Sequence, residues 1–176
     1  MAIAPGSYNL GPSNGKLLLK TGVEGPGAKM AHSLVIEVTN WSANATVADD
    51  PSQSSLRLSA DIPSFEIREG HGGVKPLSDN DRNEIKKTIA NKILGAGRVE
   101  FQSSSISSAG NSASVAGTVT INGKSAPVTV NLTDNGGSIS GRATVTQTSL
   151  DIKPFKGPLG AFRLRDAVEV EFEGRV

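Results

Sequence analysis

Cysteine is absent from this chain of 176 residues, and histidine occurs at two positions only. The lack of cysteine excludes disulfide bonds, thiolate catalysis and zinc sites built from cysteine. The two histidines, His32 and His71, are too few for a histidine-rich metal site. These absences remove several large classes of enzyme and metalloprotein.

A strong charge of one sign is also missing. The 18 lysines and arginines nearly balance the 17 acidic residues, and the formal net charge is +1. Because the basic residues form no block, nucleic acid is not expected as a partner. No apolar run reaches the roughly 18 residues of a membrane-spanning helix, so no membrane span is expected. The first residues have no basic and apolar signal pattern, which predicts a cytoplasmic location unless a leader was removed.

Aromatic residues make up 4% of the chain, whereas glycine alone occurs 20 times and Ser, Thr, Val and Ala are abundant. This balance favours strands and tight turns over helices. Apolar and polar residues alternate with a period of two, which is typical of strands with one buried face. The runs with strand character cover residues 16–21, 33–41, 43–47, 56–62, 99–101, 113–121, 128–132, 139–145 and 168–172.

One segment has the period of a helix instead. Three isoleucines recur every four residues and form a single apolar stripe. Ser78 can cap the first turn, and Gly95 can end the last one. We predict a helix over residues 79–94 that lies outside the sheet. Its stripe is expected to face inward and consists of Ile85, Ile89 and Ile93.

Eight to ten strands in near-continuous succession, with one helix and no βαβ alternation, indicate an all-β fold in a single domain over residues 1–176. An antiparallel sheet of that length tends to curl and close. The pair Asn122-Gly123 supports this reading, because Asn-Gly supplies the two positive φ angles of a tight hairpin turn. We therefore predict an antiparallel barrel of about eight strands or slightly more, with the helix near one barrel end.

Small residues recur on the faces that the alternation turns inward, where a filled barrel would need bulk. They leave volume for an apolar ligand, although they can also serve strong coiling of the sheet or close packing of the helix. A crossover over residues 155–162 can fold over one opening. The predicted cavity lining is Leu34, Ile36, Val38, Leu58, Phe101, Val115, Gly117, Val119, Val130, Gly141, Ala143, Val145, Phe155 and Phe162.

Residues that could do chemistry are scarce. A Ser-His-Asp triad could be drawn from His32, Ser33 and an aspartate, but neighbours in the sequence rarely share the required geometry. The Gly-Pro-Leu-Gly of residues 157–160 is explained by a turn. We predict no catalytic residues and no enzyme. His32, Lys153 and Arg163 are candidates for a polar rim that meets an anionic head group, with a solvated surface as the alternative for the two basic residues.

Several short motifs follow one another at residues 8–15, 32–38 with Trp41, 72–77, 81–85, 98–103, 117–123, 147–155 and 166–170. Their order and spacing resemble the YceI-like family of lipocalin-like proteins, in the form common among actinobacteria. The resemblance implies an extended antiparallel β-barrel whose lumen holds a long polyisoprenoid or similar amphiphile, with no cofactor. Two departures are visible: many relatives carry a periplasmic signal, and Ala31-His32-Ser33 stands where Gly-His-Asp is familiar.

Three functions stay open at this point. The first is binding, sequestration or transport of a polyisoprenoid or fatty-acid-like amphiphile in the lumen. The second is an enzyme that uses the barrel as a reaction chamber for a small apolar substrate. The third is a filled structural or stress-related domain with a protein partner. A homodimer through exposed strand edges is compatible with each of them.

Overall fold

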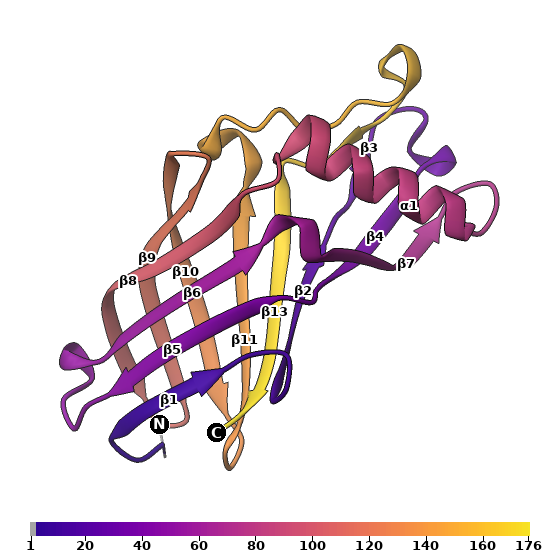
Figure 1. Cartoon of the computed structure of the whole chain (residues 1–176). Coiled ribbons are helices and arrows are strands. Elements are labelled where there is room, and N and C mark those ends of the chain that lie inside the picture. Colours follow the sequence, from indigo (N-terminus) through magenta and orange to yellow (C-terminus); the bar gives the residue numbers. More distant parts are fainter. Residues whose placement is uncertain (1–2) are drawn as a thin grey trace.

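The structure is a computed structural model that describes residues 3–176, and it consists mainly of antiparallel strands (Figure 1). Eleven strands form one sheet in the order β1-β5-β6-β8-β9-β10-β11-β13-β2-β4-β7, and β3 pairs separately with β12. The strands are β1 (Gly6–Leu10), β2 (Gly15–Lys20), β3 (Val23–Glu24), β4 (His32–Val38), β5 (Trp41–Val47), β6 (Ser55–Asp61), β7 (Phe65–Gly72), β8 (Arg98–Ala109), β9 (Ser112–Ile121), β10 (Lys124–Asp134), β11 (Ser138–Thr146), β12 (Arg163–Leu164) and β13 (Ala167–Arg175).

Helical segments are short. The α-helix is α1 (Asp79–Thr88), and a π-helix (Ile89–Ile93) continues it directly. Five 3-10 helices lie in the connections between strands, at Ala28–Met30, Pro51–Gln53, Ile62–Ser64, Gln147–Leu150 and Pro158–Gly160. Within residues 3–176, no helix is long and apolar enough to cross a membrane.

Three pairs of consecutive strands, β1–β2, β4–β5 and β6–β7, each form one long strand with a bend. The bent strand β4–β5 pairs with β1–β2 on one side and with β6–β7 on the other, and both pairings are antiparallel. At the bend, Thr39 N donates to Ser64 O (3.1 Å) and Asp61 N donates to Asn40 O (3.0 Å). These bonds carry the ladder of β4–β5 and β6–β7 across the corner.

When each bent strand is counted as one strand, the hydrogen-bonded pairing of strands closes into a full circuit. β8, β9, β10, β11 and β13 pair in succession, β13 pairs with β2, and β6 pairs with β8. The three bent strands and these five single strands give eight. The prediction of a curled antiparallel barrel of about eight strands is therefore confirmed.

Within residues 3–176, β1 and β7 each have one unpaired edge. β1 pairs only with β5 and β7 only with β4, as far as the described residues go. α1 lies beside β7, where the ammonium of Lys86 contacts the carboxylate of Glu66 and the side chain of Leu77 covers Gly70. In Figure 1 the helix crosses the upper end of the sheet. The helix is thus outside the sheet, as predicted.

The helix begins and ends near the predicted residues. Ser78 and Asp81 form a capping box, in which Asp81 N donates to Ser78 Oγ (3.1 Å) and Ser78 N donates to Asp81 Oδ2 (2.9 Å). Gly95 follows the helical segment at φ +76°, a conformation that glycine adopts without strain. The helical segment reaches to within one residue of the predicted end, but its last turn is a π-helix, in which Leu94 N donates to Ile89 O (2.8 Å).

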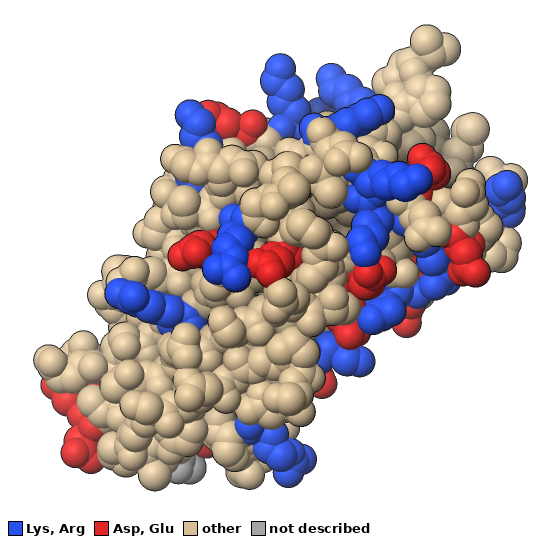
Figure 2. All heavy atoms as spheres, viewed as in Figure 1, with Lys and Arg blue, Asp and Glu red and all other residues tan. Residues whose placement is uncertain are grey.

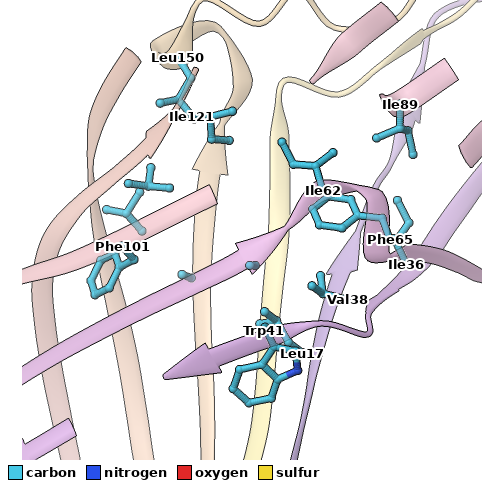
Figure 3. Packing of buried hydrophobic residues seen from close by; sticks show 14 of the residues in the cluster. Leu17, Ile36, Val38, Trp41, Ile62, Phe65, Ile89, Phe101, Ile121 and Leu150 are labelled. Carbon is cyan, nitrogen blue, oxygen red and sulfur yellow. The ribbon is translucent and has the colours of Figure 1, made fainter. Parts of the chain in front are cut away.

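Buried apolar side chains point into the space that the sheet encloses (Figure 3). Val38, Ile62 and Val115 are almost wholly buried. Ile89 of the helical segment joins the same cluster from above the sheet. The core is therefore one continuous lining of the barrel wall, to which the helix contributes.

Candidate ligand-binding cavity

The alternation of each strand becomes continuous apolar rows once the strands are in register. One row runs from Ala43 through Leu58 and Phe101 to Val119, since each of these residues is the direct partner of the next across neighbouring strands. Cross-strand partners on one face contact one another, so such a row forms an unbroken apolar band. A second row on the opposite wall links Phe65, Val38, Leu17, Phe172, Gly141 and Leu132.

These rows surround a cavity of about 880 Å³. Its volume lies near the upper end of the range of roughly 300–1,000 Å³ that is common for small-molecule sites. Its lining reaches from Tyr8 and Val47 near one end of the barrel to Phe155 and Phe162 near the other. The cavity is thus a long, largely apolar space inside the barrel.

Most of the predicted lining residues border this cavity. They come from six different strands and from the crossover at residues 155–162, and the structure brings them together. The predicted residues that line the cavity are Leu34, Ile36, Val38, Leu58, Phe101, Val115, Val119, Val130, Gly141, Ala143, Val145, Phe155 and Phe162.

Gly117 is the exception, and its prediction as a lining residue is wrong. The ring of Phe101 lies over it, and a Cβ added there would stand 2.5 Å from Phe101 Cζ. The missing side chain therefore accommodates a neighbouring ring and adds no volume to the lumen. Gly141 borders the cavity, but a Cβ there would lie 2.8 Å from Leu132 Cδ2, so part of its space is also taken.

The three predicted rim residues differ in position. His32 lines the cavity, and its Nε2 lies 2.7 Å from Lys75 O; because a carbonyl only accepts, this nitrogen donates. Arg163 is held by Glu24, with 2.5 Å between Nε and Oε1, and does not border the cavity. Lys153 is exposed and does not border it either. A polar rim made of all three residues is therefore not present.

Several lining residues were not among the predicted ones. Ile85, Ile89 and Ile93 reach the cavity from the helical segment, and Val170 and Phe172 reach it from β13. Both patterns are visible in the sequence, since the isoleucines form the helical stripe and the β13 residues alternate with glutamates. The helical period and the strand alternation could therefore have predicted these residues as part of the lining.

The lining also contains polar residues, among them His32, Glu84, Thr88 and Gln147. Gln147 is buried, and its side chain donates to Arg165 O (3.0 Å), which satisfies the amide. His71 contacts Glu69 at 2.9 Å, but both side chains are largely exposed and neither borders the cavity. Among residues 3–176, no group of three or more acidic or histidine side chains is placed to hold a metal ion.

A comparison with protein-family models matches the YceI-like domain over residues 18–176. The chain belongs to the YceI-like family. No curated protein is similar enough in sequence to count as a match.

Solved structures with the same fold have low sequence identity to this chain. BcnA of Burkholderia cenocepacia is 20% identical, with a TM-score of 0.63 over 90% of this chain and 94% of that one. Two mutants of the CJ YCEI protein are 11% identical. One, with a monobromobimane guest, has a TM-score of 0.53 over 80% of this chain and 85% of that one. The other has a TM-score of 0.57 over 80% and 84%. At these identities the similarity shows the shared fold.

Proposed function

We propose that the barrel binds a long apolar amphiphile of the polyisoprenoid or fatty-acid type in its lumen, for sequestration or transport. The observation that carries this proposal is the apolar cavity of about 880 Å³ that runs along the barrel. Each methylene moved from water into such a space contributes about 0.8 kcal/mol. A long hydrocarbon chain therefore gains more from this cavity than a short or polar molecule does.

The distribution of polar groups supports an amphiphile over a plain hydrocarbon. The middle of the cavity is lined by aliphatic and aromatic side chains, whereas His32, Glu84 and Thr88 border it where the helix lies. A polar head group placed beside these three residues would keep hydrogen-bond partners while its tail lies among the apolar rows. Family membership supports the same class of ligand.

The enzyme alternative lacks a set of converging catalytic groups. His32 borders the cavity, but its Nε2 is engaged by the Lys75 carbonyl, and no acid or base within residues 3–176 is hydrogen-bonded to its ring. A reaction chamber would need a nucleophile or a general base within reach of the substrate. If a turnover assay detects activity, His32→Ala should retain it within about tenfold, whereas loss of a general base costs about a hundredfold or more.

The decisive experiment enlarges a side chain inside the cavity. Ala143 borders the lumen and is the direct partner of Val170, so Ala143→Leu extends into space that a ligand would occupy. We expect loss of binding of a fluorescent polyprenyl probe with little change in melting temperature. Ala167→Leu, at an exposed position of β13, is the matched control and should bind the probe normally.

Native mass spectrometry of the purified parent protein completes the test. A copurified lipid, absent from Ala143→Leu, would support sequestration. Strong destabilisation by Ala143→Leu, of about 1–3 kcal/mol as in a close-packed core, together with no probe bound by the parent protein, would show that the interior is filled in solution and would refute the proposal.

A further inference from the structure

Large apolar side chains remain exposed at one end of the barrel. Five large hydrophobic residues stay exposed within residues 3–176, namely Met30, Val74, Phe155, Leu159 and Val176. Val176 lies at the chain end near β1, at the lower end of Figure 1, whereas β3, the start of α1 and the crossover before β12 lie at the upper end. The other four residues belong to those upper segments.

Hydrogen bonds hold the upper segments together. Gly27 N donates to Ala161 O (2.7 Å), which joins the turn before Met30 to the crossover. The loop that contains Val74 is attached to β4 through the contact between His32 Nε2 and Lys75 O (2.7 Å). The exposed apolar residues of this end therefore lie on three segments that are connected to one another.

Leu159 is the most exposed of these residues and stands at the tip of a hairpin. Its relative exposure is 108%, and its backbone is left-handed at φ 55°. Below the tip, Gly157 N donates to Phe162 O (2.9 Å) and Leu164 N donates to Phe155 O (2.9 Å). A leucine held in water in an unfavourable backbone conformation is costly for a monomer in solution, which points to a partner that covers it.

The surroundings of this tip are basic. Residues 152–165 contain four basic residues and no acidic one. Arg163 is paired with Glu24, but no carboxylate of the described chain lies within ion-pair distance of Lys153 or Lys156. Figure 2 shows lysine and arginine side chains along this upper edge and an uncharged protruding tip beyond them. An apolar tip with unpaired cations behind it is complementary to a surface that is anionic outside and apolar inside.

The same end borders the cavity. Met30 and Phe155 are both exposed, with 66% and 40% exposure, and both also line the cavity. The exposed apolar surface is thus continuous with the interior of the barrel. A molecule with low solubility in water could pass between this surface and the lumen without crossing bulk solvent.

We propose that this end, with Leu159 at its tip and Lys153 and Lys156 behind it, docks on the surface of an anionic lipid bilayer. Leu159, Met30 and Phe155 enter the interfacial region, and the two lysines contact anionic head groups. This docking goes beyond ligand binding in the lumen and does not require the cavity to be filled. The two proposals can therefore fail separately.

Sedimentation of the full chain with vesicles tests the docking. The probes are vesicles of phosphatidylcholine alone and of phosphatidylcholine with phosphatidylglycerol, at low and at physiological salt. We expect binding to the anionic vesicles, weakened by salt, and little binding to the neutral ones. Leu159→Asn should weaken binding about tenfold or more, since burial of a leucine is lost while asparagine tolerates the left-handed backbone. Lys156→Glu should weaken it about fivefold or more.

Matched controls lie at the other end of the barrel. Val176→Asn removes an exposed apolar side chain there, and Arg175→Glu reverses a charge on the last residue of β13. Both should bind anionic vesicles as the parent protein does. Equal loss in the controls, equal binding to neutral vesicles, or no binding at all would overturn the proposal. A dimer that Leu159→Asn dissociates, seen by light scattering without vesicles, would assign the surface to a second copy of the chain and would equally overturn it.

Discussion

Trp41 and Phe172 pack edge to face, with ring centroids 5.7 Å apart and an interplanar angle of 88°. Trp41 opens β5, and Phe172 lies near the end of β13, so the contact joins strands that are not neighbours in the sheet. Phe172 also borders the cavity, whereas Trp41 is buried behind it. The only tryptophan of the chain therefore reports on a wall of the proposed ligand site.

Phe172→Ala should lower the free energy of unfolding by about 3 kcal/mol. This value is at the lower end of the range for Phe→Ala in cores, because one side of the ring already faces a cavity. The aromatic pair itself accounts for about 0.5–1.5 kcal/mol of the loss. Urea unfolding followed by Trp41 fluorescence measures it.

The control for this variant keeps more of the side-chain volume and also removes the aromatic pair. Phe172→Leu should cost clearly less than Phe172→Ala. A Phe172→Ala protein as stable as the parent would show that Trp41 and Phe172 do not support the barrel wall.

Ile89→Asp should destabilise the protein by several kcal/mol, because it places an unpaired charge where Ile89 is 9% exposed and joins the core cluster. Thermal unfolding followed by circular dichroism is the measurement. Asn91→Asp adds the same charge at an exposed position of the same helical segment and is expected to leave the melting temperature nearly unchanged. An unchanged melting temperature for Ile89→Asp would place the stripe in solvent.

The fold could be predicted where the sequence pattern is local. β9 and β10 follow from strict alternation on both sides of Asn122-Gly123, and Asn122 adopts φ 52° in the turn. The segment 65–72 was not predicted as a strand, because Phe65 and Ile67 give only two apolar positions before polar residues and glycines follow. It becomes β7 through its pairing with β4, a long-range contact that the local pattern does not contain.

The site could be predicted in the same partial way. Period-two counting finds which residues face inward, and for Ala143 and Val130 this is sufficient, because both border the cavity. It does not show how far a neighbouring side chain extends, so Gly117 was predicted as open space although Phe101 fills it. The distinction depends on the pairing of β8 with β9 and on the rotamer of one ring.

The stability that the capping box at the start of α1 contributes should decrease at acid pH. The backbone hydrogen bond with Ser78, and then the bond with its side chain, lower the pKa of Asp81 below its ordinary value of 3.8. A carboxyl group whose pKa is lowered by folding stabilises the folded state above that value, and the contribution is lost as the pH falls below it. The excess melting temperature of the parent over Asp81→Asn should therefore shrink as the pH falls from 5 through 3.8.

Asp79→Asn is the control for the acid response, since it removes a charge from the same turn without removing the capping box. Its melting temperature should stay closer to that of the parent at neutral pH than that of Asp81→Asn does. A difference between the parent and Asp81→Asn that stays constant from pH 5 to pH 2 would contradict the role of the ionised capping box.

Gly117→Ala should destabilise the barrel by about 1–3 kcal/mol. The new methyl group would overlap the ring of Phe101, with 2.5 Å to Cζ, and would also press on the carbonyl of Gln102. The carbonyl belongs to a paired strand and cannot move freely, so Phe101 must leave its position, which is the typical cost of overpacking. Chemical denaturation measures the loss. Gly97→Ala is the control, because a Cβ there meets only Asn122 Oδ1 at an ordinary 3.5 Å. If Gly117→Ala unfolds at the same denaturant concentration as Gly97→Ala, Phe101 does not rest on Gly117 in solution, and Gly117 would again be a candidate for the cavity wall.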